Sequence, residues 1–328
     1  MIEIINNSHD PYFNLALEEY AVINLPDTQN YFILWQNQPT IVVGRNQNTI
    51  EEINSRYIEE HDIKVVRRMS GGGAVYHDLG NLNFTFVVNE NKDFTNFTKF
   101  TRPVIKALNR IGIPAENNGR NDITIGGRKF SGNAQFKYKQ RLMHHGTILF
   151  NSQLEDMVQA LNPSTEKISS KGIKSVRSRV TNISEHLSSP LSIEEFKQIL
   201  TEEVLHEETN NDTYDLSDYD LKIINNLRNN KYSTWNWIYG ASPAYNIKKT
   251  GNFDWGNIDI RLEIKHGLIK SCRIYGDYFS AHDIAELESG LVGTRYHEAD
   301  IKERLTELEL LRYLPQTDEN QITQLLFY

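Results

Sequence analysis

The first segment whose residues could take part in binding or catalysis is Arg67-Arg68-Met69-Ser70-Gly71-Gly72-Gly73. Consecutive glycines let a backbone approach a ligand closely and point successive N–H groups at one spot, which suits an anion such as phosphate. The two arginines add fixed positive charge with forked donors. No Gly-Lys-Ser/Thr ending marks a Walker A loop, and the spacing is wrong for a dinucleotide fingerprint. The segment predicts an anion site, with a flexible hairpin loop as the alternative.

A second candidate segment pairs Asn121-Asp122 with Lys129 and the stretch Ser131-Gly132-Asn133-Ala134. A carboxylate beside an amide suits a hydrated magnesium ion that bridges to phosphate oxygens. A lysine on the other arm of the same hairpin could reach the same ligand as a point charge. Taken singly, Asp122 is more often a turn former and Lys129 a solvated surface residue.

Two further segments carry histidines and basic residues. His144 and His145 are neighbours on a predicted strand, so their side chains point to opposite faces and cannot bind one ion together. We therefore expect one to be packed and the other to line a pocket. The stretch Ser170 to Val180 holds four basic residues in a Gly- and Ser-containing loop of an acidic chain. It either closes over an anionic intermediate or is an exposed, mobile loop.

The composition narrows the classes of protein that could use these residues. The chain has 328 residues, of which 39% are hydrophobic, enough for two packed domains or one domain with an appendage. Its net charge of −8 argues against a duplex nucleic-acid partner. The single cysteine, Cys272, allows neither a disulfide nor a thiolate metal site. No apolar run is long enough to span a bilayer, so we expect no membrane partner and a cytoplasmic location.

The elements that must position these residues alternate irregularly between strands and helices. Predicted strands are 31–35, 40–44, 64–68, 82–88, 122–125 and 146–150, and predicted helices are 11–21, 51–61 and 102–111. Connections between strands are short, and no regular strand–helix–strand repeat is present. This order favours an α+β sheet domain. Towards the carboxyl end, 258–264 and 268–274 form a predicted hairpin that turns at His266-Gly267, followed by helices at 281–291 and 300–311.

Taken in order, these segments resemble the lipoate–protein ligase family, within the biotin and lipoate ligase superfamily. Residues 67–81 are close to its RRxSGGGAVxHDxGN signature, and 10–16 are similar to its amino-terminal helix. The stretches 119–123, 128–132, 144–147 and 171–182 follow at family-like spacing. The resemblance covers nearly the whole chain. It implies mixed and antiparallel β-sheets flanked by helices in a catalytic domain at 1–242, a linker at 243–250, and a small α+β accessory domain at 251–328.

The resemblance also implies a reaction. Lipoate and ATP form lipoyl-AMP, with Mg²⁺, and the lipoyl group passes to a lysine of apo lipoyl domains. Such domains belong to 2-oxoacid dehydrogenase complexes and to the glycine-cleavage H protein. Lys129 is the implied catalytic residue, which holds the lipoate carboxylate and the α-phosphate together and offsets developing charge. No protein nucleophile is needed.

Further roles follow by resemblance. Expected ATP and lipoyl-AMP contacts are Arg68, Ser70, Gly71, Gly72, Gly73, Ala74, Val75, Tyr76, His77, Asn81, Asn83, Asn121, Asp122, Lys129, Gly132 and Ala134. Expected lipoate contacts are Lys129, His145, Gly146 and Thr147, with Val75, Phe84, Phe130 and Ala134 as candidates for the apolar slot. Lys171 and Arg177 are expected to close over the adenylate, and Asn121 with Asp122 to bind phosphate-linked Mg²⁺.

Four alternatives remain at this stage. A lipoyl or octanoyl amidotransferase requires a nucleophilic thiol in the pocket, whereas Cys272 lies outside every pocket motif. A biotin ligase would carry a GRGRxG-type loop where this chain has residues 67–72. A transferase of preformed lipoyl-AMP would keep the same lysine as a ligase. The last alternative is a non-catalytic binding protein with the same fold.

Overall fold

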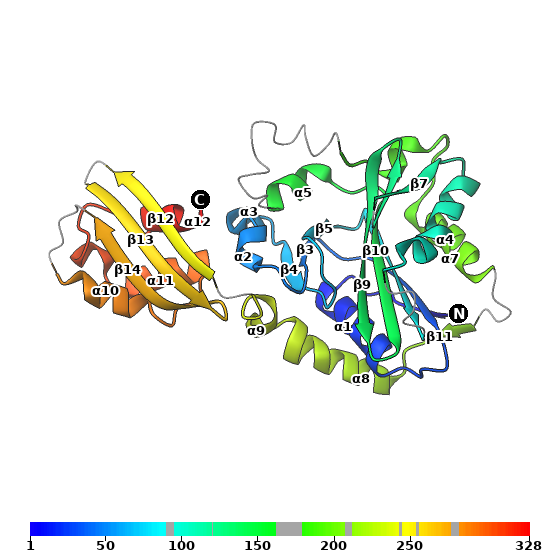
Figure 1. Ribbon diagram of the computed structural model, residues 1–328, viewed down its shortest axis with the longest axis horizontal. Helices are drawn as coiled ribbons and strands as arrows, with labels where there is room; N and C mark the ends of the chain where they lie inside the picture. Colours follow the sequence, from blue (N-terminus) through cyan, green and yellow to red (C-terminus); the bar gives the residue numbers. More distant parts are fainter. Residues whose placement is uncertain are drawn as a thin grey trace. The chain divides into compact units, whose positions relative to one another are not determined.

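The computed structural model describes residues 1–89, 95–119, 121–161, 179–206, 212–242, 245–253, 256–276 and 282–328. They form two compact units. The first comprises Met1–Gln47 and Glu51–Thr234, and the second comprises Asn48–Ile50 and Trp235–Tyr328 (Figure 1). Both units combine helices with mixed or antiparallel sheets, so the predicted α+β class is confirmed. In the part of the chain described, no helix is long and apolar enough to cross a membrane.

The first unit is built on an eight-stranded sheet with the order β11-β1-β2-β6-β10-β9-β8-β7. Its strands are β1 (Ile2–Ile4), β2 (Tyr31–Trp35), β6 (Asn81–Val88), β7 (Ala115–Asn118), β8 (Asp122–Ile125), β9 (Arg128–Tyr138), β10 (Arg141–Leu149) and β11 (Asp212–Tyr214). β1 runs parallel to β2 and β11, and the other pairs are antiparallel. Every residue of β2 and β6 is buried, which indicates that both faces of the sheet are covered.

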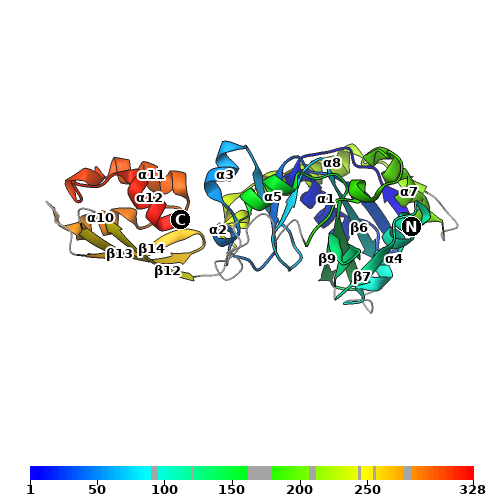
Figure 2. The ribbon, with the colours of Figure 1, turned by 90° about the horizontal axis from the view of Figure 1, so that it is seen from above.

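The helices of the first unit are α1 (Pro11–Ile23), α3 (Ser55–Glu60), α4 (Phe97–Arg110), α5 (Leu154–Ala160), α7 (Ile193–Leu205) and α8 (Asp218–Leu227), with short turns η1 (Ile183–His186) and η2 (Arg228–Tyr232). Of these, α1, α4, α7 and α8 lie on the two faces of the eight-stranded sheet (Figures 1 and 2). Two ribbon views show α4 with α7 on one side of the strands, and α1 with α8 together on the other (Figures 1 and 2). The main hydrophobic core lies on the α4 side, where Phe100 packs on Phe86 of β6 and Phe196 of α7 stacks on Phe150.

Local sequence signals explain most helix boundaries. α1 begins as predicted, because the Asp10 carboxylate accepts a hydrogen bond from Tyr12 N and Pro11 occupies the first turn. The predicted helix at 51–61 is instead two short ones, α2 (Thr49–Glu52) and α3, because Asn54 caps a new helix start. α4 begins five residues earlier than predicted, at Phe97, with Asn96 as its cap.

A separate three-stranded sheet carries the glycine-rich loop. Its strands are β3 (Thr40–Val43), β4 (Lys64–Arg67) and β5 (Val75–His77), in the order β4-β3-β5. The loop leaves β4 and enters β5, and it turns back against the end of β3 at Gly44. A Cβ on Gly44 would lie 2.1 Å from Gly72 O, and Gly72 has a φ of +97°. Both positions therefore require glycine.

The second unit is a three-stranded antiparallel sheet covered by helices. Its elements are α9 (Trp235–Ile238), β12 (Tyr245–Phe253), β13 (Gly256–Lys265), β14 (Leu268–Gly276), α10 (Ile284–Leu291), α11 (Glu298–Glu307), η3 (Leu310–Arg312) and α12 (Glu319–Phe327). The β13–β14 hairpin turns at His266-Gly267, as predicted, with positive φ at both residues. Residues 245–250, which the sequence assigned to a linker, form the first part of β12, where Ile247 packs on the core.

Candidate active site

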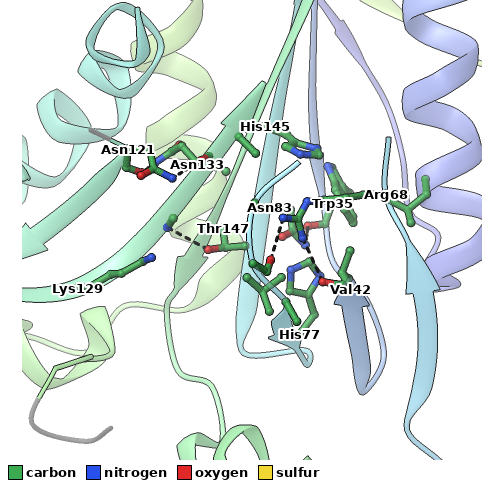
Figure 3. A pocket seen from close by; sticks show the side chains of 18 residues that line it. Trp35, Val42, Arg68, His77, Asn83, Asn121, Lys129, Asn133, His145 and Thr147 are labelled. Carbon is green, nitrogen blue, oxygen red and sulfur yellow. Dashed lines mark hydrogen bonds between the residues drawn. The ribbon is translucent and has the colours of Figure 1, made fainter. Parts of the chain in front are cut away.

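A cavity of about 150 Å³ lies between the eight-stranded sheet and the glycine-rich loop of the first unit (Figure 3). The sheet contributes side chains from β2, β6, β9 and β10, and the smaller sheet contributes Val42, Val75 and His77. α1 adds Leu15 at one wall. The cavity is thus assembled from segments that are distant in sequence.

Most of the predicted site residues come together here. Those that line the cavity are Arg68, Gly72, Gly73, Ala74, Val75, His77, Asn83, Asn121, Lys129, Gly132, Ala134, His145, Gly146 and Thr147. Predicted residues that do not line it are Ser70, Gly71, Tyr76, Asn81 and Asp122. Lys171 and Arg177, predicted to close over an adenylate, lie outside the described residues.

The predicted apolar slot is partly wrong. Phe84 and Phe130 are fully buried in the core on the α4 side and do not line the cavity. Leu15, Trp35 and Val42 form apolar wall instead, and Asn133 is a further lining residue that the sequence did not single out. The alternation of strand side chains could have separated the two faces, but the sequence does not tell which face a ligand enters.

Lys129 is held rigidly at the start of β9. The turn before it consists of Gly126 and Gly127, both with positive φ. Its backbone N–H donates to Arg179 O at 2.8 Å and its carbonyl accepts from Thr181 N at 2.9 Å. The strand register shifts by one residue beside it, so that Phe130 enters the core while Lys129 lines the cavity.

The Lys129 ammonium has one carboxylate partner in the described structure. Its Nζ lies 2.8 Å from Asp122 Oδ1, with the two side chains 41% and 36% exposed. A Cβ at position 132 would stand 2.9 Å from the same Nζ, so Gly132 leaves the ammonium room along the strand. Lys129 therefore places a partly solvated positive charge at the cavity wall, next to the Asp122 carboxylate.

Arg68 shapes the glycine-rich loop from within. Its Nη2 donates to the carbonyls of Gly71 and Gly73 at 2.8 Å, and its Nη1 donates to Val42 O at 3.1 Å. Burial lowers the pKa of the Arg68 guanidinium to about 10, so it stays charged at neutral pH. The sequence predicted forked donors for a phosphate. In the structure these donors hold the loop carbonyls, so that the arginine orders the loop and adds positive charge behind it.

A buried hydrogen-bonded chain fixes Arg68 in turn. Glu18 Oε1 lies 2.9 Å from His145 Nδ1, His145 Nε2 lies 2.6 Å from Ser70 Oγ, and Arg68 Nε donates to that same hydroxyl oxygen at 3.0 Å. A carboxylate only accepts, so Nδ1 of His145 donates to Glu18. In the neutral imidazole Nε2 then accepts the Ser70 hydroxyl hydrogen. The sequence predicted Ser70 as a ligand contact, whereas its hydrogen-bonding groups are engaged within the protein.

The same carboxylate organises the apolar wall. Trp35 Nε1 donates to Thr85 Oγ1 at 2.9 Å, and Thr85 Oγ1 donates to Glu18 Oε1 at 2.6 Å. The indole is thereby fixed with its polar edge paired, and it contributes its ring to the cavity wall.

His77 offers an unused donor to the cavity. It is 2% exposed, and its Nδ1 lies 3.1 Å from Asn37 Nδ2, whose own Oδ1 accepts from Asn14. Its Nε2 is buried and has no hydrogen-bond partner in the described structure. Burial, with the Arg68 charge nearby, lowers the pKa of His77 to about 3. The neutral ring accepts at Nδ1, so Nε2 carries the hydrogen that a ligand oxygen could accept.

His144 and His145 face opposite sides of β10, as strand geometry requires. His144 is fully buried, stacks on Phe100 with ring centroids 4.7 Å apart, and lies 3.2 Å from Asn133 Oδ1. Burial lowers the pKa of His144 well below its ordinary value. His145 lines the cavity. Across the described ranges, no group of three His, Cys, Asp or Glu side chains could hold a metal ion.

Asn121 is positioned by Asn133 across the β8–β9 hairpin. Asn121 Nδ2 donates to Asn133 O at 2.7 Å, while Asn133 N donates to Asn121 O at 3.0 Å. The Asn121 carboxamide therefore lines the cavity in a fixed orientation, next to the Asp122 carboxylate in the chain.

Comparison with known proteins gives matches over both units. Residues 10–205 match the family described as the lipoyl protein ligase A/B catalytic domain, and residues 242–326 match the bacterial lipoate protein ligase C-terminus. Lipoate–protein ligase 1 of Staphylococcus aureus is 47% identical over 322 residues, which cover 98% of each chain.

Two solved structures extend the likeness. One is LipL1 of P. falciparum in complex with lipoate, with a TM-score of 0.62 and 27% identity over 98% of this chain and 99% of that one. The other is a bipartite lipoate protein ligase from Thermoplasma acidophilum, described with its E2 lipoyl domain. Its TM-score is 0.67 at 26% identity, over 74% of this chain and 97% of that one.

Proposed function

Since this chain belongs to the lipoyl protein ligase A/B family and is a lipoate–protein ligase, we propose how its cavity activates lipoate with ATP and passes the lipoyl group to a protein lysine. The observation that carries the proposal is the Lys129 ammonium at the wall of a partly apolar cavity, between Asp122 and the glycine-rich loop. A cation there can meet a carboxylate from the cavity and a phosphate from the loop.

Lipoate enters the cavity with its apolar end first. Leu15, Trp35 and Val42 supply a dry wall for the hydrocarbon and the ring, while Lys129 receives the carboxylate. Neutral His77 adds a single N–H donor without a charge that would need hydration. Burial of apolar surface contributes about 25 cal/mol per Å² to binding.

ATP lies along the glycine-rich loop. Gly72, Gly73 and Ala74 line the cavity with backbone that a phosphate can approach closely, and Arg68 behind them supplies fixed positive charge. The lipoate carboxylate attacks the α-phosphorus, and pyrophosphate leaves. Lys129 is close to both reacting groups and stabilises the negative charge that grows on the phosphate oxygens.

Mg²⁺ fits the residues present if phosphate and water supply most of its ligands. Asp122 offers one carboxylate and Asn121 one carboxamide, fewer than a complete protein cage. Mg²⁺ usually binds through one or two carboxylates plus substrate phosphates and waters. The ion, when bound, neutralises phosphate charge. Asp122 would then exchange its ion pair with Lys129 for the metal and release the ammonium towards the ligand.

Transfer needs no nucleophile from this chain. The lysine of an acceptor attacks the carbonyl of lipoyl-AMP, AMP leaves, and Lys129 polarises the carbonyl oxygen. The acceptors we propose are apo lipoyl domains of 2-oxoacid dehydrogenase complexes and the glycine-cleavage H protein, in the cytoplasm. An amidotransferase route through a thioester is disfavoured, because Cys272 is buried in the second unit and burial raises its pKa to about 12.

The test is incubation of the protein with lipoate, ATP and Mg²⁺ and a panel of apo lipoyl domains, read by intact mass. We expect each modified acceptor to gain one lipoyl group only when all three reagents are present. ATP–pyrophosphate exchange that depends on lipoate separates the two half-reactions. Transfer from supplied lipoyl-AMP without any exchange would contradict the proposed activation step and leave a lipoyl-AMP-dependent transferase.

A further inference from the structure

A second cavity of the first unit lies at the turn between β9 and β10, at the other end of β9 from Lys129. Its volume is about 470 Å³. It is lined by Val22, Ile23, Leu25, Pro26, Asp27, Asn89, Tyr138, Lys139, Gln140 and Arg141. None of these residues belongs to the catalytic cavity, so the two sites are distinct in composition.

Arg141 is the charged centre of this second cavity. The residue is only 6% exposed. Its Nη1 donates to the carbonyls of Val22 and Leu25, at 3.3 and 2.8 Å, and so anchors the guanidinium to the end of α1. The Tyr31 ring lies beside the guanidinium, with its centroid 5.8 Å from Cζ. The side chain is therefore fixed in place by one of its terminal nitrogens.

The opposite edge of the same guanidinium is unpaired. Arg141 Nε and Nη2 are both buried, and neither has a hydrogen-bond partner in the described structure. These two nitrogens present parallel N–H groups, the fork that binds both oxygens of a carboxylate or two oxygens of a phosphate. A buried charged donor without an acceptor is strongly unfavourable. An anion that reached these two nitrogens would complete their hydrogen bonding.

The rest of the lining favours a carboxylate that carries an apolar body. Val22, Ile23, Leu25 and Pro26 contribute hydrocarbon to the lining, and Ile23 and Pro26 are exposed. Asp27 also lines the cavity and interacts electrostatically with Arg141, so a bound anion would share the arginine charge with this carboxylate. Asn89, the residue after β6, has a buried Oδ1 with no hydrogen-bond partner; this acceptor would take a donor group and so makes no contact with a carboxylate itself. A carboxyl-bearing molecule with an apolar chain would pair the fork and cover the hydrocarbon together.

We propose that the Arg141 cavity is a second ligand site, which binds an aliphatic carboxylate through the Nε–Nη2 edge of Arg141. Its ligand class overlaps the alkyl carboxylates that the ligase reaction consumes, so the site allows such a molecule to occupy the enzyme outside the catalytic cavity. The proposal does not depend on the catalytic roles assigned above, because no catalytic lining residue takes part.

The experiment is equilibrium dialysis of the full chain against radiolabelled octanoate. We expect the wild type to bind one equivalent more than Arg141→Met, whose affinity for that equivalent falls about a hundredfold with the loss of a bidentate charged pair. The matched control is Arg110→Met, because Arg110 is an exposed arginine of α4 that pairs with Glu202, and it should bind as the wild type does.

Since Arg141 also anchors α1, a second variant protects the test from a folding defect. Asn89→Asp puts a carboxylate in the cavity without removing the anchor, and it should also lose the extra equivalent. Acetate and inorganic phosphate serve as competitors. We expect acetate to compete more weakly than unlabelled octanoate, because it lacks the apolar body.

Three results would overturn the proposal. They are equal stoichiometry in the wild type and Arg141→Met, an extra equivalent retained in Asn89→Asp, and displacement by phosphate more effective than by acetate. The last result would assign the fork to a phosphate ligand.

Discussion

The two units of this protein bury very different side chains. The first unit encloses charged and polar groups at its core, including Glu18, Arg67, Arg68, His77 and His144. The second unit has a core of aliphatic and aromatic residues, and Glu288 is the only buried charged side chain among its described residues. In the first unit, buried charged and polar side chains such as Arg68 and His77 line the candidate ligand cavity. The second unit is stabilised mainly by apolar burial.

The difference shows what burial of charge requires. Glu288 is paired with Ile274 N at 2.7 Å and with Arg273 Nη1 at 2.6 Å, so its charge is compensated at the sheet edge. In the first unit Glu18 and Arg68 are compensated within the protein, whereas His77 Nε2 keeps an unpaired group that faces the cavity. Unpaired buried groups are costly, so where they persist a ligand is the natural partner.

The largest expected effect comes from Lys129→Ala. Loss of the ammonium should lower the rate of lipoyl-AMP formation by about a hundredfold to a thousandfold, as for removal of one electrostatic contact to a transition state. The measurement is lipoate-dependent pyrophosphate exchange. Lys137→Ala is the matched control, because Lys137 is exposed on the same strand, and it should keep full activity. Normal turnover of Lys129→Ala would remove the residue from its proposed role.

Truncation of the apolar core tests the second unit. Ile301 is fully buried in that core, and Ile301→Ala should lower its free energy of unfolding by about 2–5 kcal/mol. Chemical denaturation measures the loss. Pyrophosphate exchange, assayed below the unfolding range, should stay unchanged, because the catalytic cavity lies wholly in the first unit. A variant that is folded but inactive in pyrophosphate exchange would contradict the claim that the first unit alone forms the catalytic cavity.

Acid should weaken the first unit through His77. Its pKa is lowered to about 3 by burial, while an unfolded histidine titrates near about 6.5. Between these values the unfolded chain binds more protons, so stability is lost as the pH falls from about 6.5 towards 3, by up to about 1.4 kcal/mol per pH unit. Thermal unfolding at pH 7.5, 6 and 5 measures the slope. His77→Gln keeps a neutral donor and should reduce the slope by the share of His77, while His144, whose pKa burial also lowers, keeps its own share. An unchanged slope would exclude His77 as a source.

The smallest expected effect on activity is that of Cys272→Ala. The thiol is 2% exposed and its pKa is raised to about 12, chiefly by burial, so it is neither accessible nor ionised. We expect unchanged lipoyl transfer, and slow alkylation of the native wild type by iodoacetamide. An inactive but folded variant would revive the amidotransferase alternative, which needs this thiol as its nucleophile.

Local sequence signals predicted much of the catalytic architecture. The cap at Asp10 and the glycine turn before Lys129 specify their elements through neighbouring residues alone, and both were predicted from the sequence. The sequence prediction missed the division of 51–61 into two helices. Asn54 caps the second helix only because the chain changes direction there, and the sequence alone does not show that change of direction. Leu15 and Trp35 were missed as lining residues, because each looks like an ordinary core position until the cavity is assembled.

By itself, the sequence determined the family, the α+β class and the hairpin that carries Lys129, because ordered motifs and short-range backbone preferences are written in adjacent residues. The resemblance implied His145 as a site residue, and the structure places it at the cavity wall; only the tertiary structure decided that the Arg68 donors bind the glycine loop. It alone revealed the unpaired edge of Arg141. The physical reason is that the alternation of side chains along a strand defines two faces of the sheet. Which face becomes core and which lines the cavity depends on the packing of α1 and α4, which come from distant parts of the chain.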